Sequence, residues 1–288
     1  MATTIAAGFN QLKSNLEITN LQAGTVSTRQ SEVRKAVENE LQTLNSFVAG
    51  SYVRNTMIAP LASADVDVFM VLAAKYFSPT GYASLLDRLR AALLKRYPTT
   101  PRISRNGQAV TIIFTDFRVD VVPAFNRKGG GYLIPDSVGQ RWISTDPTVH
   151  ITKWAEANKW HEGNLVPLLK MLKAWNRSHS ELLNSFHLEA LAKQVLTNVR
   201  ISDYPSGARY VFDKARALVN IALADPAGYD GDIGRYLNTT DKRAAVAQRL
   251  QRAYDQSVEA EGFAGRGNIR AAFEKWQTVF GDCFPAYG

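Results

Sequence analysis

Apolar residues along this chain follow two spacings, which occupy different parts of the sequence. Apolar runs typical of buried strands occur before residue 145, at about 65–72, 109–114 and 118–122. Apolar residues three and four positions apart predict helices over about 28–46, 81–97, 164–177, 180–199, 207–223, 241–259 and 268–280, and a short one near Phe9, Leu12 and Leu16. We therefore predict a mixed domain over residues 1–145, including the N-terminal helix, and a helical domain over residues 146–288.

Composition places the chain among ordinary globular proteins. Its 288 residues are 45% hydrophobic and 21% charged, enough for one large or two modest domains. A formal charge of +8 suggests a polyanionic partner such as a nucleotide, a nucleic acid or a membrane surface, although a basic surface kept for solubility explains it equally well. The one cysteine, Cys283, excludes an intrachain disulfide and a cysteine-rich zinc site. With no membrane-length apolar run and no secretion signal, we expect a cytoplasmic protein.

Two acidic residues stand at the start of the apolar run 65–72. Side chains alternate along a strand, so Asp65 and Asp67 share one face. Neighbouring carboxylates repel each other unless a cation lies between them, and hard oxygen ligands suit Mg²⁺. Gly50 and Ser51 precede them, the serine by fourteen residues, and a glycine lets a phosphate approach the backbone closely. Either feature alone has little meaning, but together they indicate a nucleotide site.

A third acid is expected on a later strand. Asp120 lies within the valine-rich stretch 118–122, where a buried charge requires a partner or a metal. Asp116 is the competing candidate, but its position beside Thr115 favours ordinary turn chemistry. We take Asp120 as the third carboxylate.

The remaining polar motifs are weaker. Lys170 and Lys173 are neighbours on a predicted helix, and in isolation they are best interpreted as solvated lysines. The glycine-rich stretch 127–136 lacks a phosphate-loop pattern and is interpreted as a flexible connection. The aspartates of 225–237 miss the calcium-loop spacing, and the four histidines show no metal-ligand spacing.

The ordered series GSYVRNT, DVDVF, RVDVVPAF, YLIPD, LVPLLKMLKAWNR and SFHLEALA resembles the bacterial CD-NTases, the CdnE clade among them. These are nucleotidyltransferases similar to cyclic GMP–AMP synthase and DncV. The resemblance covers about Arg29 to Pro285. It implies an α+β fold: a polymerase-β-like nucleotidyltransferase core with a mixed sheet, then an α-helical lobe like that of oligoadenylate synthase, with a cleft between them.

The resemblance also implies roles for individual residues. Two Mg²⁺ ions, which Mn²⁺ can replace, would be bound by the three acids, Asp65, Asp67 and Asp120. The donor triphosphate would be held by the turn of Gly50 and Ser51. Further phosphate contacts fall on Lys170, Lys173 and Ser185, and Phe186 would stack on the donor base.

The implied activity is the joining of nucleoside triphosphates, ATP among them, into a cyclic di- or trinucleotide in antiphage signalling. The product would act on a separate effector protein, and the enzyme would be a monomer that needs neither a membrane nor nucleic acid. Three alternatives stay open: nucleotide addition to RNA, as poly(A) and CCA-adding enzymes do, nucleotide attachment to a protein, and a catalytically silent nucleotide or RNA sensor. The presence of all three acids argues against the last.

Overall fold

The computed structural model describes residues 2–99, 102–229 and 231–288. Its contacts divide the chain into two compact units. We call one the sheet unit, composed of Ile18–Lys153 and Ala227–Asp230, and the other the helical unit, composed of Met1–Glu17, Trp154–Pro226 and Gly231–Gly288.

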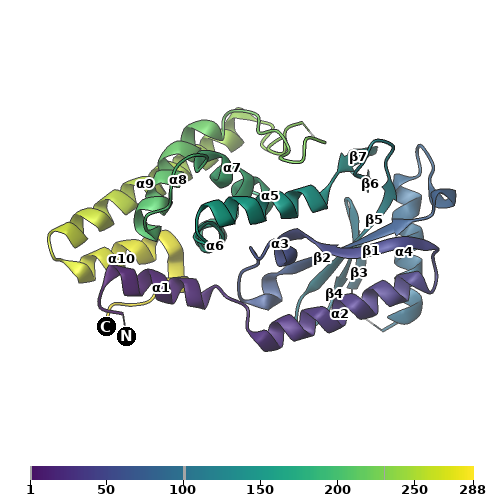
Figure 1. Ribbon diagram of the computed structural model, residues 1–288, viewed down its shortest axis with the longest axis horizontal. Coiled ribbons are helices and arrows are strands. Elements are labelled where there is room, and N and C mark those ends of the chain that lie inside the picture. The colour runs from purple at the N-terminus through teal and green to yellow at the C-terminus, as the bar shows by residue number, and fades with distance from the viewer. Residues whose placement is uncertain (1, 100–101, 230) are drawn as a thin grey trace. The chain divides into compact units, whose positions relative to one another are not determined.

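The sheet unit is built on a mixed sheet with the strand order β1-β2-β5-β4-β3, extended by β6, which pairs with β5 and β7 (Figure 1). Among the strand pairings of the described residues in this unit, only that of β2 with β5 is parallel. Its strands are β1 (Thr43–Ala49), β2 (Asp65–Leu72), β3 (Arg102–Asn106), β4 (Ala109–Ile113), β5 (Arg118–Asn126), β6 (Tyr132–Asp136) and β7 (Arg141–Thr145). Its helices are α2 (Asn20–Glu38), α3 (Gly50–Val53) and α4 (Tyr82–Arg96).

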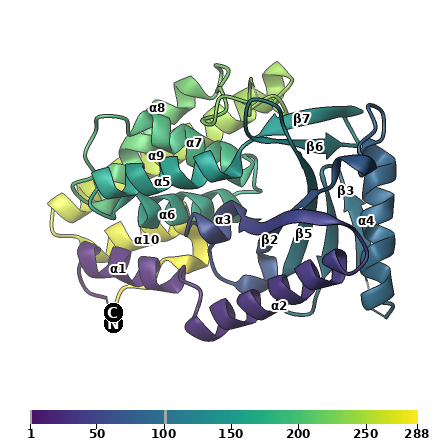
Figure 2. The ribbon, with the colours of Figure 1, turned by 45° about the vertical axis from the view of Figure 1, so that its right-hand side comes forward.

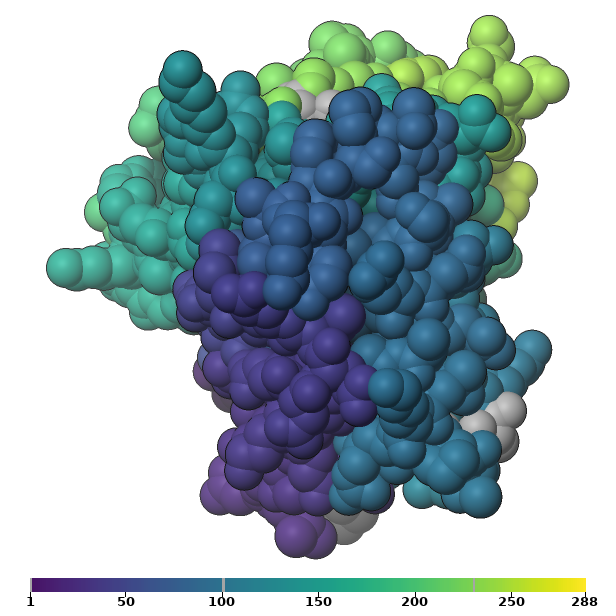
Figure 3. Space-filling model, turned by 90° about the vertical axis from the view of Figure 1, so that its right-hand side faces the viewer, coloured from purple at the N-terminus to yellow at the C-terminus, as the bar shows by residue number. Residues whose placement is uncertain are grey.

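One face of the sheet packs on α2 and α4 (Figure 2). In Figure 3 the residues of α2, in purple, lie beside those of α4, in blue. Alternate residues of β2 and β5 point into this core, among them Val66, Val68, Val119 and Val121, all fully buried. Burial of each such side chain contributes roughly 1.5–3 kcal/mol. The alternation leaves the other residues of both strands, including the three aspartates, on the opposite face.

Two local predictions for this unit were wrong. The helix expected over 28–46 ends at Glu38, and β1 begins at Thr43, where its backbone pairs with β2. Leu44 fits the helical spacing of the preceding apolar residues only by chance, because its side chain is exposed and not buried. The stretch 127–136 is not simply a flexible connection, because β6 occupies its second half. Gly129, Gly130 and Gly131, all at positive φ, make the turn between β5 and β6.

The helical unit contains α1 (Ile5–Asn15), α6 (Leu165–Ser178), α7 (Ser185–Val195), α8 (Tyr204–Leu218), α9 (Thr240–Gly265) and α10 (Ile269–Phe280). Helix α5 (Pro147–Trp160) starts in the sheet unit and ends in this one. The sequence placed the N-terminal helix with the sheet, but α1 packs here because Phe9 makes edge-to-face contacts with Trp276, Phe280 and Phe284. None of the helices in the described residues has the length and apolar character needed to cross a bilayer.

The helix expected over 180–199 is shorter than predicted. Ser180 and Glu181 adopt positive φ, and the Asn176 side chain bonds to the backbone of Leu183, so α7 starts only at Ser185. The fold class itself is confirmed: a mixed sheet with helices comes first, and helices follow.

Candidate functional site

The three predicted aspartates lie on the two parallel strands of the sheet. Asp67 of β2 is the register partner of Asp120 of β5, and Asp65 is the partner of Arg118. The alternation of strand side chains places all three aspartates on the face opposite α2 and α4. The sequence placed them on two separate stretches, and the structure brings those stretches together as neighbours.

The surroundings of Asp120 shift the pKa of its carboxyl. Burial raises the pKa of its carboxyl, the hydroxyl of Thr111 partly offsets this by donating a hydrogen bond to Oδ1, and the charge of Asp65 raises it further. Thr111 is the antiparallel register partner of Asp120 on β4. Negative charge is therefore concentrated on a partly dehydrated part of the sheet, where a cation would relieve the repulsion.

Gly50 lies directly against the Asp67 carboxylate. Ala49, the last residue of β1, pairs with Asp67, and Gly50 follows with φ +69°. A Cβ built on Gly50 would lie 1.7 Å from Asp67 Oδ2, which no side chain could tolerate. The Gly50–Ser51 turn thus borders the aspartates as predicted, and its glycine is required by both backbone conformation and space.

The competing acid, Asp116, behaves as a turn residue. It lies between β4 and β5, where its Oδ1 accepts a hydrogen bond from the backbone N–H of Phe117. Its other oxygen lies 3.7 Å from Arg29 Nε. These contacts account for Asp116 without a catalytic role.

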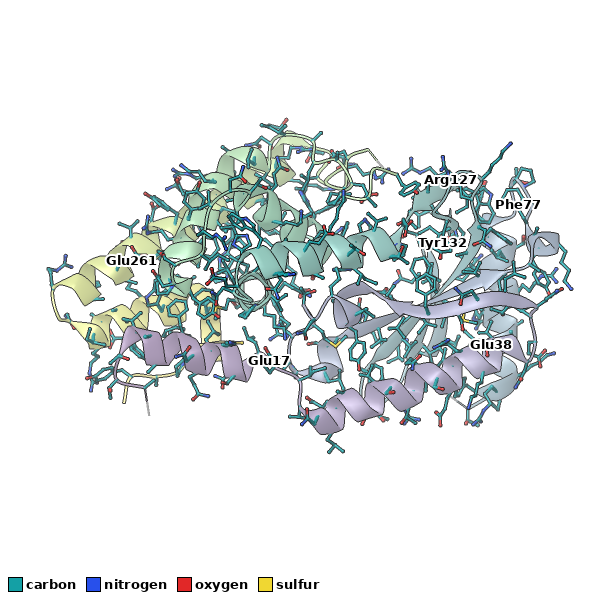
Figure 4. The ribbon with its side chains drawn as sticks, viewed as in Figure 1. Glu17, Glu38, Phe77, Arg127, Tyr132 and Glu261 are labelled. Atoms are coloured by element: carbon teal, nitrogen blue, oxygen red, sulfur yellow. The ribbon has the colours of Figure 1, made fainter. Side chains whose placement is uncertain are left out.

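The two lysines of α6 are not solvated. Lys170 is 2% exposed, and its Nζ lies 2.6 Å from Oε2 of Glu17. Figure 4 labels Glu17, which lies just beyond the end of α1. Lys173 is 8% exposed and lies 3.3 Å from Oε1 of Glu189, which is completely buried. Both lysines therefore have a carboxylate partner within the helical unit. The interpretation of the two residues, taken in isolation, as solvated lysines was wrong.

Ser185 and Phe186 begin α7. Ser185 is exposed, while Phe186 stacks on Trp154 at a centroid distance of 5.6 Å. The residue before them is held by Tyr236, whose hydroxyl accepts the Asn184 N–H at 2.8 Å. Burial raises the pKa of Tyr236 to about 12, so the phenol stays protonated.

Among the residues that the structure describes, no three histidine, cysteine, aspartate or glutamate side chains are gathered as a complete metal site. The roles of Asp65, Asp67, Asp120, Gly50, Ser51, Lys170, Lys173, Ser185 and Phe186 therefore stay predictions. Sequence reasoning missed Thr111 and Tyr236. A polar residue in the apolar run AVTII, nine positions before Asp120, was a usable signal for Thr111, but none pointed to Tyr236.

Comparison with known proteins identifies the family. A family model described as the Second Messenger Oligonucleotide or Dinucleotide Synthetase domain matches residues 3–158, more than half of the chain. The chain is 24% identical over 337 residues to a probable cyclic nucleotide synthase of Bacillus cereus, covering 99% of this chain and 98% of that protein. It is 27% identical over 297 residues to a cyclic AMP-AMP-AMP synthase of an Acinetobacter species, covering 96% and 84% respectively.

A solved structure shows the same fold. Escherichia coli CdnC with ATP matches with a TM-score of 0.80 at 16% identity, over 98% of this chain and 99% of that one. The chain therefore belongs to the second messenger oligonucleotide or dinucleotide synthetase family, the bacterial CD-NTases, and is a nucleotidyltransferase of the cyclic oligonucleotide synthase class.

Proposed function

We propose that this nucleotidyltransferase joins nucleoside triphosphates into a cyclic di- or trinucleotide second messenger and releases pyrophosphate. The observation that carries the proposal is the side-by-side placement of Asp67 and Asp120 on parallel strands, with Asp65 on the same face. Gly50 adds to it, because its lack of a side chain leaves room for the Asp67 carboxylate. The names of the relatives in Bacillus cereus and Acinetobacter support the same reaction class here.

The aspartates fit Mg²⁺, which we propose as the cofactor, with Mn²⁺ as a replacement. Three carboxylates share one face of two adjacent strands, and burial, together with the charge of Asp65, raises the pKa of Asp120. Proteins usually hold Mg²⁺ through one or two carboxylates plus water and substrate phosphates, so a complete protein cage is not required. We assign Asp65, Asp67 and Asp120 as ligands for two ions. When bound, such ions neutralise the triphosphate and lower the pKa of the attacking hydroxyl.

We assign to Asp120 the role of proton acceptor. Its carboxylate takes the proton of the acceptor's ribose hydroxyl, and that oxygen attacks the donor α-phosphate. A new P–O bond forms as the bond to pyrophosphate breaks, which leaves a linear intermediate. A second transfer within the intermediate closes the ring. Gly50 and Ser51 hold the donor triphosphate, because the glycine allows close backbone approach.

In the helical unit we propose Lys170, Lys173 and Ser185 as phosphate contacts and Phe186 as the stacking residue for the donor base. Ser185 is exposed, so its hydroxyl is accessible to a phosphate. Both lysines already bond to carboxylates, so phosphate would have to join or replace Glu17 and Glu189. Replacing Lys173 with Met should therefore raise the KM for ATP more than it lowers kcat.

The test is nucleotide transfer by purified protein with labelled ATP and other triphosphates plus Mg²⁺, followed by chromatography and mass spectrometry. Asp67→Asn and Asp120→Asn should each reduce product formation by about 10³-fold or more, because each removes a proposed ligand charge. Asp116→Asn is the matched control, and it should retain full activity. Equal activity of Asp67→Asn and the parent enzyme would refute the metal assignment, and product seen only with added RNA would favour a tailing enzyme.

We further propose that the product activates a separate effector protein in antiphage defence, and that the enzyme acts as a monomer in the cytoplasm, where triphosphates are available. Neither a membrane nor nucleic acid is needed in this proposal. Cells that carry the Asp67→Asn enzyme with its neighbouring genes should be as sensitive to phage as cells without the system, in a plaque assay against the parent enzyme.

A further inference from the structure

A small basic hollow lies in the helical unit, apart from every residue proposed above to bind nucleotide. Its volume is about 130 Å³. The C-terminal end of α6 and one face of α9, both labelled in Figure 1, supply its walls. The lining residues are Trp175, His179, Arg249, Arg252, Ala253 and Gln256. No carboxylate is among them, so the lining carries net positive charge.

The two arginines differ from three other charged residues of α9, which form ion pairs. Glu259 pairs with Lys275, Glu261 with Arg209, and Arg243 with Asp232. In contrast, the side chains of Arg249 and Arg252 form no hydrogen bond, ion pair or ring contact with any other described residue. Like charges three positions apart on a helix repel each other. Among the described residues, no carboxylate is therefore in contact with either guanidinium group.

The other polar residues of the hollow add further hydrogen-bonding groups, both a donor and acceptors. His179 Nδ1 lies 2.8 Å from the backbone oxygen of Trp175, which can only accept, so Nδ1 carries a proton and donates it there. This bond holds the ring in place, and in the neutral ring Nε2 is left to accept a hydrogen bond, as from the P–OH group of a singly charged phosphate. Gln256 contributes an amide, and the buried side chain of Trp175 is an apolar part of the lining.

We propose that this hollow binds a phosphate group, either as free inorganic phosphate or as the end of a phosphate monoester. Guanidinium groups match the oxygens of phosphate with paired hydrogen bonds, which favours this anion over a halide. Pockets for whole drug-sized ligands measure about 300–1,000 Å³, so a hollow of this size takes one phosphate group and leaves any remaining part of the ligand in solvent. The inference does not depend on the proposed catalytic function.

The experiment is calorimetric titration of the full-length protein with inorganic phosphate and, separately, with glycerol 3-phosphate at constant ionic strength. The double variant Arg249→Ala Arg252→Ala should bind at least tenfold more weakly than the parent. The matched control is Arg266→Ala Arg270→Ala, which removes the same charge from arginines that stack on Phe263 and Tyr287. This control should bind as the parent does.

The two ligands separate the sources of the phosphate group. Binding of both identifies the phosphate group itself as the ligand, whereas binding of inorganic phosphate alone identifies the free anion. Arg249→Lys Arg252→Lys keeps the charge but loses the paired hydrogen bonds, so it should also weaken binding, and it replaces the alanine variant if that one does not fold. No measurable binding, or equal weakening in both alanine double variants, would overturn the proposal.

Discussion

At the scale of single residues, the Asp67 carboxylate leaves no space for a side chain at Gly50. Gly50 adopts φ +69°, and any Cβ would overlap the Asp67 carboxylate. A side chain at Gly50 would therefore either move Asp67 or shift the turn that begins α3. Both changes would disturb the carboxylate that is the register partner of Asp120.

We predict that Gly50→Ala lowers nucleotide transfer by at least about tenfold and destabilises the fold by roughly 1–3 kcal/mol, the usual cost of a strained backbone position. Activity is followed with labelled triphosphates and stability by urea denaturation. Gly24→Ala in α2 is the control, because a Cβ there meets nothing within 4 Å. It should keep activity and gain roughly 0.5–1 kcal/mol of stability. Full activity in Gly50→Ala would contradict the geometry.

At the scale of elements, α6 and α7 are joined by a buried ion pair. Lys173 of α6 meets Glu189 of α7, and the glutamate is entirely removed from solvent. Removing one member of a buried pair leaves an uncompensated charge, whereas replacing both with apolar residues is often neutral.

Glu189→Gln should therefore lower the free energy of unfolding by about 3–5 kcal/mol. The double variant Lys173→Met Glu189→Leu should recover most of that loss. Glu274→Gln, at an exposed position of α10, serves as control and should change stability by no more than about 0.5 kcal/mol. Denaturant titrations of the variants measure all of these differences, and an unchanged midpoint for Glu189→Gln would disprove the coupling.

The start of α7 also carries a titratable group. His187 is buried with its Nδ1 2.9 Å from the Tyr236 hydroxyl. Burial lowers the pKa of His187, an effect to which Arg243 adds and which Asp232 opposes. The unfolded chain thus binds this proton more readily than the folded one.

The stability that neutral His187 contributes is complete above the unfolded pKa of about 6.5 and is lost as pH falls through the folded value. We predict that the free energy of unfolding decreases between about pH 7 and pH 5 and that His187→Gln makes this decrease shallower. His161, whose pKa burial also lowers, acts in the same direction and should account for part of the remaining slope. An unchanged slope in His187→Gln would show that its titration is not linked to folding.

At the scale of the whole molecule, a formal charge of +8 suits triphosphate substrates. A ligand that binds only the folded protein stabilises it, by about 2.7 kcal/mol at one hundred times its Kd. We predict that ATP with Mg²⁺ raises the thermal unfolding temperature, that EDTA cancels both this rise and the activity, and that Mn²⁺ restores them. Asp67→Asn should show a much smaller rise. A shift that survives EDTA undiminished would argue against the metal in nucleotide binding.

The sequence alone predicted the α+β class, the helices near 81–97 and 164–177, and the acid-bearing strands, because periodic apolar residues report directly on which face is buried. It also placed Gly50, Asp65, Asp67 and Asp120 in one proposed site. Asp67 and Asp120 interrupt the apolar pattern of core strands, so the sequence reveals them without coordinates.

Tertiary structure alone decided the features that depend on long-range partners. Helix α2 ends at Glu38 because residues of the following strand, β1, pair with β2. Helix α1 belongs to the helical unit because Phe9 packs on α10. The tertiary structure gave Lys170 and Lys173 carboxylate partners that no local pattern specifies. Strand pairing and buried ion pairs join residues distant in the chain, so their energy appears only once the chain has folded and brought those residues into contact.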